Sequence, residues 1–445
     1  MPVSPARAAA FDILLRVERE DAYASELLHS SRHAKLSPAD HGLATELVMG
    51  VLRWRSLLDE SIAAQSTQRL EKLDLEVLTA LRLAAYQISF LDRVPHRAAV
   101  HESVELVKRA RKRSATAFVN AVLRKFPEKT EPSATLRHIE NTKTTSELAQ
   151  TSAHPLWLVE RWAGEFGFEA ARKICGHDQH PPETAIRVSD PAFSEELKQE
   201  GIELAPGKLL ASARTVIAGD ITKTRAFREG RLAIQDEASQ LVALLAGRGQ
   251  NILDCCAAPG GKTRVLAERN PEAKIVAVEL YQHRARLLKK LAPANNIQVV
   301  CADIREFSMA EPYDLVLADV PCSGTGTLAR NPEIKWRLKL EDLLDLQSRQ
   351  TTILLAAMKQ VALGGRLVYS TCSLERGENA DVVEKALATD ISFRLLDCRA
   401  ELERLHSDGE LVWNSSDSLT SGNFLRTLPG IHPCDGFFAA ILQRS

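Results

Sequence analysis

The sequence predicts an α/β protein: a parallel sheet covered by helices on both faces, preceded by an all-helical region and a small α+β insert. Strand and helix patterns alternate beyond Asn251, as expected for strands joined by crossover helices. Before about residue 126, apolar residues instead recur three and four positions apart, without strand signals. The length of 445 residues also exceeds what one compact core usually holds, so we expect several domains.

The first expected region is helical from Ala6 to about Phe126. Ser37 is a good N-cap for a helix that has Pro38 at its first position. Residues 127–150 are polar and rich in turn formers, so we predict a linker there.

Basic side chains are concentrated in the helical region. Residues 1–130 contain 20 Lys and Arg against 16 Asp and Glu, although the whole chain has a net charge of −1. Five basic residues lie close together: Lys108, Arg109, Arg111, Lys112 and Arg113. Such a cluster suits contact with phosphates, but a solvated helix face explains it equally well.

Beyond His154 a helix is followed by two short strand candidates, Thr184–Val188 and Thr215–Ala218, which predict the α+β insert. Later helices are expected at Tyr281–Leu291 and Leu340–Leu363. The main sheet is expected to contain the strands Ile252–Cys256, Ile275–Glu279, Gln298–Cys301, Leu315–Ala318 and Arg366–Ser370. Ligands of such sheets bind at the carboxyl ends of the strands.

Composition narrows the class of protein. Hydrophobic residues at 45% and charged residues at 26% are ordinary for a soluble protein, and no apolar run is long enough to span a membrane. The first residues lack the apolar core of a secretory signal, so we expect a cytoplasmic protein. The eight cysteines include no C-x-x-C pair, which favours reduced thiols over a disulfide scaffold or a metal site.

The first motif is Leu253–Thr263, which contains Ala-Ala-Pro-Gly-Gly-Lys-Thr after a strand. Small residues there let the backbone approach a ligand, and the following helix offers its N-terminus to an anion. A phosphate-binding P-loop is disfavoured, because it needs a glycine where Cys256 stands and because Pro259 stiffens the loop. A turn with only a structural role is the remaining alternative.

Two carboxylates follow the next strands. Glu279 ends a strand about twenty residues beyond the first motif, where an acidic side chain can accept both hydroxyls of a ribose. Many strands end in an exposed carboxylate, so this position is weak evidence when taken alone. Asp303 could accept from an adenine amino group, and is equally suited to cap a helix.

Two cysteines mark the last motifs. Cys322 lies in Asp319–Thr327, three residues after a carboxylate and on a turn with proline and glycine. Cys372 follows the strand Arg366–Ser370. A single free cysteine is often a buried filler. Two free cysteines that both follow strands, at the edge of the sheet where ligands bind, indicate a catalytic role.

The segments Ala257–Thr263, Asp319–Trp336 and Tyr369–Asn379, in this order, resemble the motifs of the Sun/Fmu family of RNA cytosine-5 methyltransferases. One cysteine in Pro-Cys-Ser-Gly and one in Ser-Thr-Cys-Ser are specific to that family. Gln235–Ser239 and Asp435–Ala439 are also similar to family features.

The helical region resembles a NusB-type RNA-binding domain in the segments Ala8–Leu15, Glu46–Trp54 and Phe118–Lys125. Within the Sun/Fmu family, this fusion is typical of the RsmB type, which modifies 16S ribosomal RNA. The resemblance implies a class I, Rossmann-like methyltransferase sheet at residues 241–445. Before it would lie a NusB-like domain at 1–130, a linker at 131–150 and an RNA-binding α+β subdomain at 151–240.

The resemblance also implies roles for individual residues. S-adenosylmethionine would be the cofactor, with Glu279 at its ribose, Asp303 near its adenine, and Lys262 near its methionine carboxylate. Asp319 would approach both the cofactor and the target base. The loop lining the cofactor would comprise Cys256, Ala257, Ala258, Pro259, Gly260, Gly261 and Lys262.

Cys372 would be the nucleophile, and Cys322 would assist release of the product; no metal is implied. Glu279 departs from the Asp that relatives often have, which puts only the geometry of the ribose contact in doubt. Arg284 matches a basic position in relatives, but we assign no contact to it.

The chemistry of the target base agrees with this resemblance. Carbon 5 of cytosine is a poor nucleophile, and a thiolate that adds at carbon 6 makes it enamine-like. The base must leave its stack, so we expect single-stranded or loop RNA as the substrate. The resemblance implies that this RNA is 16S ribosomal RNA before full subunit assembly, modified by a monomeric enzyme. The alternatives are a non-catalytic RNA-binding factor and a methyltransferase acting on DNA or protein. An enzyme for glutamine or adenine would more typically have Asn-Pro-Pro-Tyr at the Cys322 turn.

Overall fold

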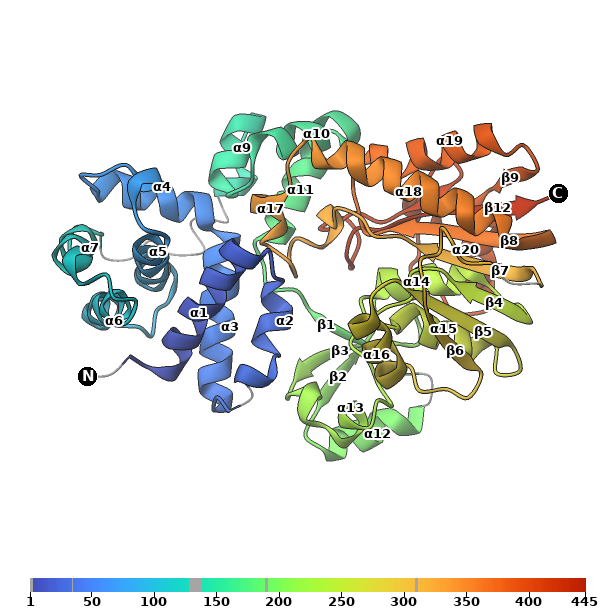
Figure 1. Ribbon diagram of the computed structural model, residues 1–445, viewed down its shortest axis with the longest axis horizontal. Coiled ribbons are helices and arrows are strands. Elements are labelled where there is room, and N and C mark those ends of the chain that lie inside the picture. Colours follow the sequence, from blue (N-terminus) through green and yellow to red (C-terminus); the bar gives the residue numbers. More distant parts are fainter. Residues whose placement is uncertain (1–2, 34, 128–137, 189–190, 309–310) are drawn as a thin grey trace. The chain divides into compact units, whose positions relative to one another are not determined.

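The computed structural model describes residues 3–33, 35–127, 138–188, 191–308 and 311–445. The chain forms two compact units. The helical unit comprises Met1–Pro181 together with Leu328–Arg337, and the sheet unit comprises Pro182–Thr327 and Leu338–Ser445 (Figure 1). The helical unit therefore includes ten residues from late in the chain.

All regular elements described in the helical unit are helices, as the apolar periodicity predicts. Ser37 caps α3 by accepting a hydrogen bond from the Asp40 amide at 3.1 Å, as expected. The α-helices are α1 (Pro5–Glu20), α2 (Ala24–Leu28), α3 (Pro38–Arg53), α4 (Arg55–Gln65), α5 (Leu75–Phe90), α6 (His96–Arg109), α7 (Thr116–Leu123), α9 (Thr145–Thr151), α10 (Leu156–Phe166), α11 (Phe168–Asp178) and α17 (Ile334–Arg337). Short 3-10 turns are η1 (Ser31–His33), η2 (Leu70–Lys72) and η3 (Arg113–Ala115).

The stretch expected to be a linker is partly helical. Its residues 145–150 belong to α9 (Thr145–Thr151), and Leu148 is fully buried there. Residues 128–137 of that stretch lie outside the described residues. The sequence did not predict this helix, because only two of its side chains are buried and the apolar periodicity of a helix is therefore missing.

The sheet unit is built on a nine-stranded, mostly parallel sheet, which confirms the predicted fold class. The strand order is β10-β11-β12-β8-β7-β4-β5-β6, with β9 paired to β12. The pairs among β4 to β8 are parallel, and the pairs of β12 are antiparallel. The strands are β4 (Asn251–Asp254), β5 (Lys274–Glu279), β6 (Ile297–Cys301), β7 (Tyr313–Asp319), β8 (Val361–Thr371), β9 (Phe393–Leu396), β10 (Thr420–Ser421), β11 (Phe424–Arg426) and β12 (Phe438–Arg444).

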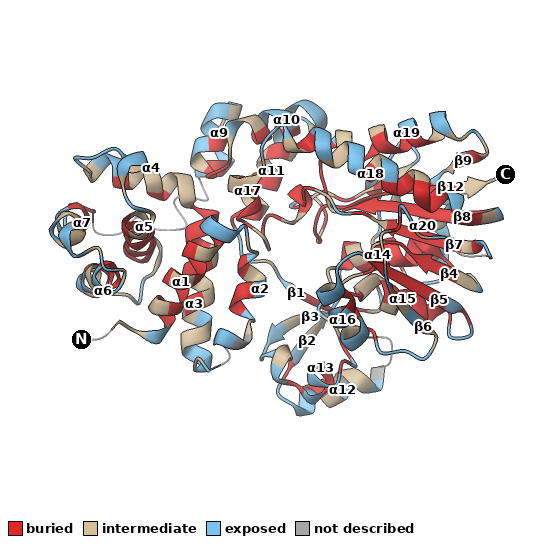
Figure 2. Ribbon diagram, in the orientation of Figure 1, coloured by how far each residue is buried: buried red, intermediate tan, exposed pale blue. Residues whose placement is uncertain are grey.

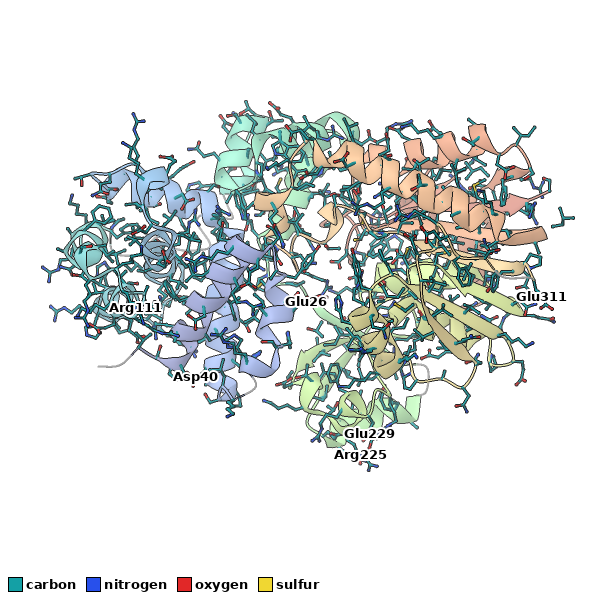
Figure 3. The ribbon with its side chains drawn as sticks, in the orientation of Figure 1. Glu26, Asp40, Arg111, Arg225, Glu229 and Glu311 are labelled. Atoms are coloured by element: carbon teal, nitrogen blue, oxygen red, sulfur yellow. The ribbon has the colours of Figure 1, made fainter. Side chains whose placement is uncertain are left out.

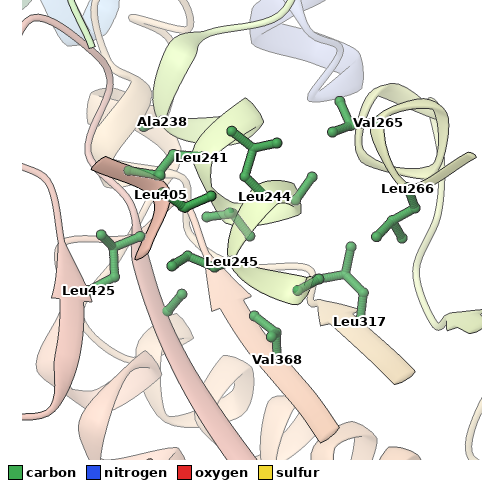
Figure 4. Close-up of a cluster of buried hydrophobic side chains, with 14 of the residues drawn as sticks. Ala238, Leu241, Leu244, Leu245, Val265, Leu266, Leu317, Val368, Leu405 and Leu425 are labelled. Atoms are coloured by element: carbon green, nitrogen blue, oxygen red, sulfur yellow. The ribbon is translucent and has the colours of Figure 1, made fainter. Parts of the chain in front are cut away.

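Helices cover both faces of this sheet, because successive residues of each strand point to opposite sides. In β7, Leu315 and Leu317 pack in the cluster of Figure 4 with residues of α14 and α15, whereas Val316 and Ala318 pack with α18 and α19. Figure 2 shows the central strands buried, as in other parallel sheets. The helices are α14 (Glu237–Ala246), α15 (Gly261–Arg269), α16 (Gln282–Leu291), α18 (Asp342–Lys359), α19 (Ala380–Thr389) and α20 (Cys398–Ser407). The 3-10 turns are η5 (Thr325–Thr327), η6 (Arg376–Glu378) and η7 (Ser416–Leu419).

One expected helix is too long in the prediction. The helix predicted to reach Leu363 ends at Lys359, and β8 begins at Val361. Gly364 has a φ of +73°, a conformation that a helix does not contain. Gly364 and Gly365 therefore lie inside β8, where its register with β7 shifts, and the apolar run of the sequence had concealed the start of this strand.

The insert forms a separate three-stranded antiparallel sheet of order β1-β3-β2. Its elements are β1 (Thr184–Arg187), α12 (Pro191–Gln199), β2 (Glu203–Pro206), β3 (Ala213–Ala218), η4 (Ile221–Lys223) and α13 (Arg225–Arg228). Leu197, Ile202 and Leu232 belong to its own small core. Arg225 and Glu229, labelled in Figure 3, form an exposed ion pair at 2.6 Å beside this core. No helix in the described part of the chain is long and apolar enough to cross a membrane.

Candidate functional site

The predicted site residues lie at the carboxyl ends of neighbouring parallel strands. Asp254 ends β4, Glu279 ends β5, and Asp319 ends β7. Asp319 is opposite Ser370 of β8 in the register of the sheet, and Cys372 follows one residue after the end of β8. The topology therefore brings the motifs to one edge of the sheet, where ligands of this architecture bind.

The loop after β4 is packed tightly against α16. Gly260 has a φ of +111°, and a Cβ there would come within 2.7 Å of Leu288 Cδ1. A Cβ on Gly261 would lie 3.2 Å from the side chain of Gln235. The loop Cys256–Gly261 therefore presents its backbone at the N-terminus of α15, where amide groups can bind an anion.

Lys262, on the first turn of α15, is engaged with Asp319. Its Nζ lies 2.6 Å from Asp319 Oδ2 and 5.0 Å from the centre of the Phe437 ring. Asp319 Oδ1 accepts a hydrogen bond from Ser370 Oγ at 2.7 Å. The carboxylate is therefore held by two strands and a helix. From the sequence we predicted a cofactor contact for Lys262, but we did not predict its ion pair with Asp319.

Glu279 is buried at the end of β5, with 3% of its surface exposed. It accepts a hydrogen bond from the Tyr281 amide at 3.1 Å, and Arg284 Nη1 lies 3.8 Å away. Arg284 also donates to the carbonyl of Ala258 at 3.1 Å. Arg284 thus links the loop after β4 to the acidic residue, a contact that we had not predicted.

Asp303 follows β6 and caps its own turn. It accepts from the Arg305 amide at 2.9 Å and forms an ion pair with the Arg305 guanidinium. That hydrogen-bonded guanidinium is the main reason why the pKa of Asp303 lies below its ordinary value. Asp303 therefore caps a turn, and not the helix that the alternative expected. Its contact with adenine stays a prediction.

Asp254 is a buried carboxyl beneath the loop. Thr263 Oγ1 donates to it at 2.7 Å. Burial raises its pKa to about 7, and the nearby charge of Asp319 acts in the same direction. The carboxyl group of Asp254 is therefore protonated up to about pH 7, whereas an exposed aspartate is already ionised above its ordinary pKa of 3.8.

This shift predicts a pH effect on stability. In the unfolded chain Asp254 ionises near 3.8, whereas the folded protein keeps its proton up to about pH 7. The folded state therefore holds more protons in this window, and the free energy of unfolding falls as pH rises through it. The free energy of unfolding should fall by about 4 kcal/mol across this window. Asp254→Asn should remove this dependence on pH. Denaturant unfolding at pH 4.5 and 7.5 measures it; equal slopes in both proteins would contradict the assignment.

The two cysteines face each other. Cys322 Sγ and Cys372 Sγ are 3.4 Å apart, and both thiols are free and partly buried. The pKa of Cys322 is raised well above its ordinary value, first by its hydrogen bond with Cys372 and then by burial. Cys322 therefore keeps its proton, and its S–H can donate to the sulfur of Cys372. The loops are also linked directly, because the Gly326 amide donates to the Cys372 carbonyl at 2.9 Å.

The structure adds residues that the sequence did not single out. Glu378 and Gln350 lie under the cysteine loops, and Phe437 lies beside Lys262. Glu378 and Phe437 fall within segments noted for their resemblance to a family, but nothing in the pattern showed what they contact. Gln350 gave no signal, since one polar residue on the apolar face of a helix has many explanations.

The segment Arg330–Trp336, which continues the Cys322 motif in the sequence, lies in the helical unit. Lys335 is buried there and donates to the carbonyls of Arg53 at 2.9 Å and Ala153 at 3.0 Å. Trp336 Nε1 donates to the Leu52 carbonyl at 2.6 Å. The latter part of this motif therefore anchors helices.

The basic cluster of the helical unit is largely paired. Lys108 pairs with Glu105 at 2.6 Å, Arg109 with Asp12 at 2.8 Å, and Lys112 with Asp74 at 3.0 Å. Arg111, labelled in Figure 3, is exposed and has a φ of +62°. The cluster is thus a set of mostly compensated charges on a solvated surface, which weakens its interpretation as a phosphate site.

Comparison with known proteins places the chain in a family. Residues 241–443 match the family model of the 16S rRNA methyltransferase RsmB/F, and residues 4–128 match the NusB family. The probable ribosomal RNA small subunit methyltransferase B of Bacillus subtilis (strain 168) is 35% identical over the whole of both chains. The corresponding methyltransferase B of Vibrio cholerae is 31% identical, covering 98% of this chain and 97% of the relative. The chain belongs to the RsmB/F family of 16S ribosomal RNA methyltransferases.

Solved structures agree with this fold. The crystal structure of PH0851 superposes with a TM-score of 0.80 at 23% identity and covers all of both chains. NSun6 from Pyrococcus horikoshii with SFG has a TM-score of 0.56 at 20% identity, covering 66% of this chain and 99% of that one. The Rossmann-like sheet and the NusB-type helical domain of this RsmB/F protein are therefore established.

RsmB/F proteins use S-adenosylmethionine as methyl donor, and the residues present suit this group. The loop backbone at the N-terminus of α15 can hold a carboxylate. Glu279 is an acidic side chain at the end of β5, where a ribose is bound in related architectures. The site therefore offers partners to both polar ends of the donor.

Proposed function

We propose that this RsmB/F protein methylates carbon 5 of a cytosine in 16S ribosomal RNA through a covalent adduct with Cys372. The observation that carries the proposal is the pair of free thiols, 3.4 Å apart, at the strand ends that also hold Asp319. One thiol alone is enough to form an adduct. Two opposed thiols suit a reaction in which an adduct must both form and break.

In this mechanism the Cys372 thiolate adds to carbon 6 of the ring, and the electrons of the 5,6 double bond move toward the ring nitrogen and carbonyl. Carbon 5 becomes enamine-like and takes the methyl group that S-adenosylmethionine supplies as an electrophile. A base then removes the proton from carbon 5. The electrons of that C–H bond restore the double bond and expel the Cys372 sulfur.

Cys322 and Asp319 would act on either side of this adduct. The raised pKa of Cys322 keeps it a thiol, so it can donate to the Cys372 sulfur when that sulfur leaves the ring. Asp319 can accept a hydrogen bond from the amino group of the cytosine. In its protonated form it could also donate to the ring nitrogen, which would stabilise the negative charge that develops on the pyrimidine. Its bonds with Lys262 and Ser370 hold the carboxylate in one orientation.

The cofactor would lie along the loop after β4. We assign the loop residues Cys256, Ala257, Ala258, Pro259, Gly260 and Gly261 to its lining, Glu279 to the ribose, and Asp303 to the neighbourhood of the adenine. Lys262 would hold the methionine carboxylate while remaining close to Asp319. The target base would be extruded from RNA that the complete subunit does not yet enclose, because the reaction needs access to both faces of the ring.

Lys262→Ala should weaken binding of S-adenosylmethionine by about tenfold or more, since a charged partner is lost. RNA affinity should change less. Calorimetry with the cofactor and filter binding with a 16S fragment measure the two. Lys289→Ala, on the exposed side of α16, is the matched control for loss of one positive charge. Unchanged cofactor affinity in Lys262→Ala would refute the role.

The function itself is tested by bisulfite sequencing of 16S ribosomal RNA from cells that lack the protein. One protected cytosine should become convertible, and expression of the wild-type chain should restore its protection. Expression of Cys372→Ala should not restore it. An unchanged bisulfite pattern in the deletion strain would overturn the proposal.

A further inference from the structure

One buried carboxylate contacts the loops of both cysteines. Glu378 has no exposed surface, and its two oxygens accept four hydrogen bonds. Oε1 accepts from the Ser323 amide and from Gln350 Nε2, each at 2.8 Å. Oε2 accepts from the hydroxyls of Ser323 and Ser373, each at 2.5 Å. These two serines directly follow the two cysteines in the sequence, so one side chain bonds to the neighbour of each.

Glu378 is itself fixed to β8. Its carbonyl accepts from the Tyr369 hydroxyl at 2.6 Å. The next residue, Asn379, accepts from Thr371 Oγ1 at 2.5 Å and donates to the Ser373 carbonyl at 2.8 Å. The carboxylate is therefore presented from a turn that is tied to the same strand that leads into the Cys372 loop.

We propose that Glu378 is a positioning residue of the methyl transfer, holding the loops of Cys322 and Cys372 so that their sulfur atoms face each other. The inference rests on the proposed function, because it assigns a purpose to the opposed thiols. Charge-assisted hydrogen bonds to an ionised carboxylate are the strongest of their kind in proteins. A displacement of about 1 Å in a reacting group costs on the order of 100-fold in rate. The hydrogen bonds of Glu378 therefore fix the distance between the sulfur atoms of Cys322 and Cys372.

Glu378 is not suited to take the proton from carbon 5 of the base. An ionised carboxylate has two oxygens, and each of these already accepts two donors. The side chain is also fully buried, so a substrate atom cannot reach it. Its contribution must pass through the loops that it holds.

The first experiment measures adduct formation in the Cys322→Ala background, with labelled RNA and excess enzyme on a denaturing gel. Adding Glu378→Gln should slow adduct formation by about tenfold or more, because the amide replaces one acceptor by a donor. Cofactor affinity should be unchanged. Asp314→Asn is the control: this carboxylate accepts the amides of Gln250 at 2.7 Å and Asn251 at 3.0 Å at the opposite end of the sheet. Adduct formation at the parent rate, or slowed only as much as in the control, would overturn the proposal.

A second experiment needs no RNA and reports the thiol geometry directly. Diamide takes up one hydrogen atom from each thiol as the Cys322–Cys372 disulfide forms, and mass spectrometry of the linked peptides gives the rate. Ser373→Ala removes one bond to Glu378 but keeps the carboxylate, so it serves if Glu378→Gln does not fold. Both variants should oxidise more slowly than the wild type. Equal rates would overturn the positioning role even in an active enzyme, whereas absence of cytosine methylation by the wild type would overturn only the proposed function.

Discussion

Cys372→Ala should reduce the single-turnover rate of cytosine methylation by on the order of 10⁴-fold or more, the size of loss seen when a catalytic nucleophile is removed. Without the sulfur, carbon 6 receives no nucleophile and carbon 5 stays too electron-poor to accept a methyl group. Binding of the cofactor should persist, because Cys372 lies at the end of β8 and the proposed cofactor loop follows β4. The measurement is transfer of a labelled methyl group to a 16S fragment by excess enzyme.

The matched control for this variant is Cys301→Ala. Cys301 is also a thiol at the carboxyl end of a strand of the sheet, but it is exposed and ends β6. It should methylate at the wild-type rate. Calorimetry with S-adenosylmethionine then distinguishes an inactive folded protein from an unfolded one. A Cys372→Ala protein that binds the cofactor and still methylates at an undiminished rate would remove the basis of the proposed mechanism.

The sequence predicted the architecture because its signals are local and repeated. The strands that end in Glu279 and Asp319 read as apolar runs, since a parallel sheet buries both faces of each strand. The motifs after them therefore had to meet at one edge. The α-helix over Thr145–Thr151 was missed, because few of its residues face the core.

The contacts within the site were less accessible from the sequence. Lys262 and Asp319 are 57 positions apart, and only the packing of α15 against the sheet shows that they form an ion pair. Gln350 and Glu378 come from α18 and η6 and meet under the cysteine loops. Spacing along the chain carries no information on side chains that meet only through folding, so the roles of these residues could be inferred only from the three-dimensional structure. The segment Arg330–Trp336 shows the converse: continuity in sequence suggested one site, whereas its residues pack in the helical unit.

Cys322→Ala should give the opposite phenotype to Cys372→Ala: a covalent protein–RNA species that accumulates to about one equivalent of enzyme. In the wild type, the thiol of Cys322 lies 3.4 Å from the Cys372 sulfur and keeps its proton, so it can stabilise that sulfur as it leaves carbon 6. Without it, the adduct forms, accepts the methyl group and then breaks down slowly. The trapped RNA should therefore carry the labelled methyl group.

A denaturing gel run with labelled RNA, and again with labelled methyl donor, measures both features of this species. The double variant Cys322→Ala, Cys372→Ala should show no shifted band, which locates the bond at Cys372. The decisive comparison is between the two single variants, since the same gel would show a band for Cys372→Ala if the cysteines had exchanged roles. A nucleophilic cysteine reacts as its thiolate, so the single variant that still forms the band is the one that retains the attacking sulfur.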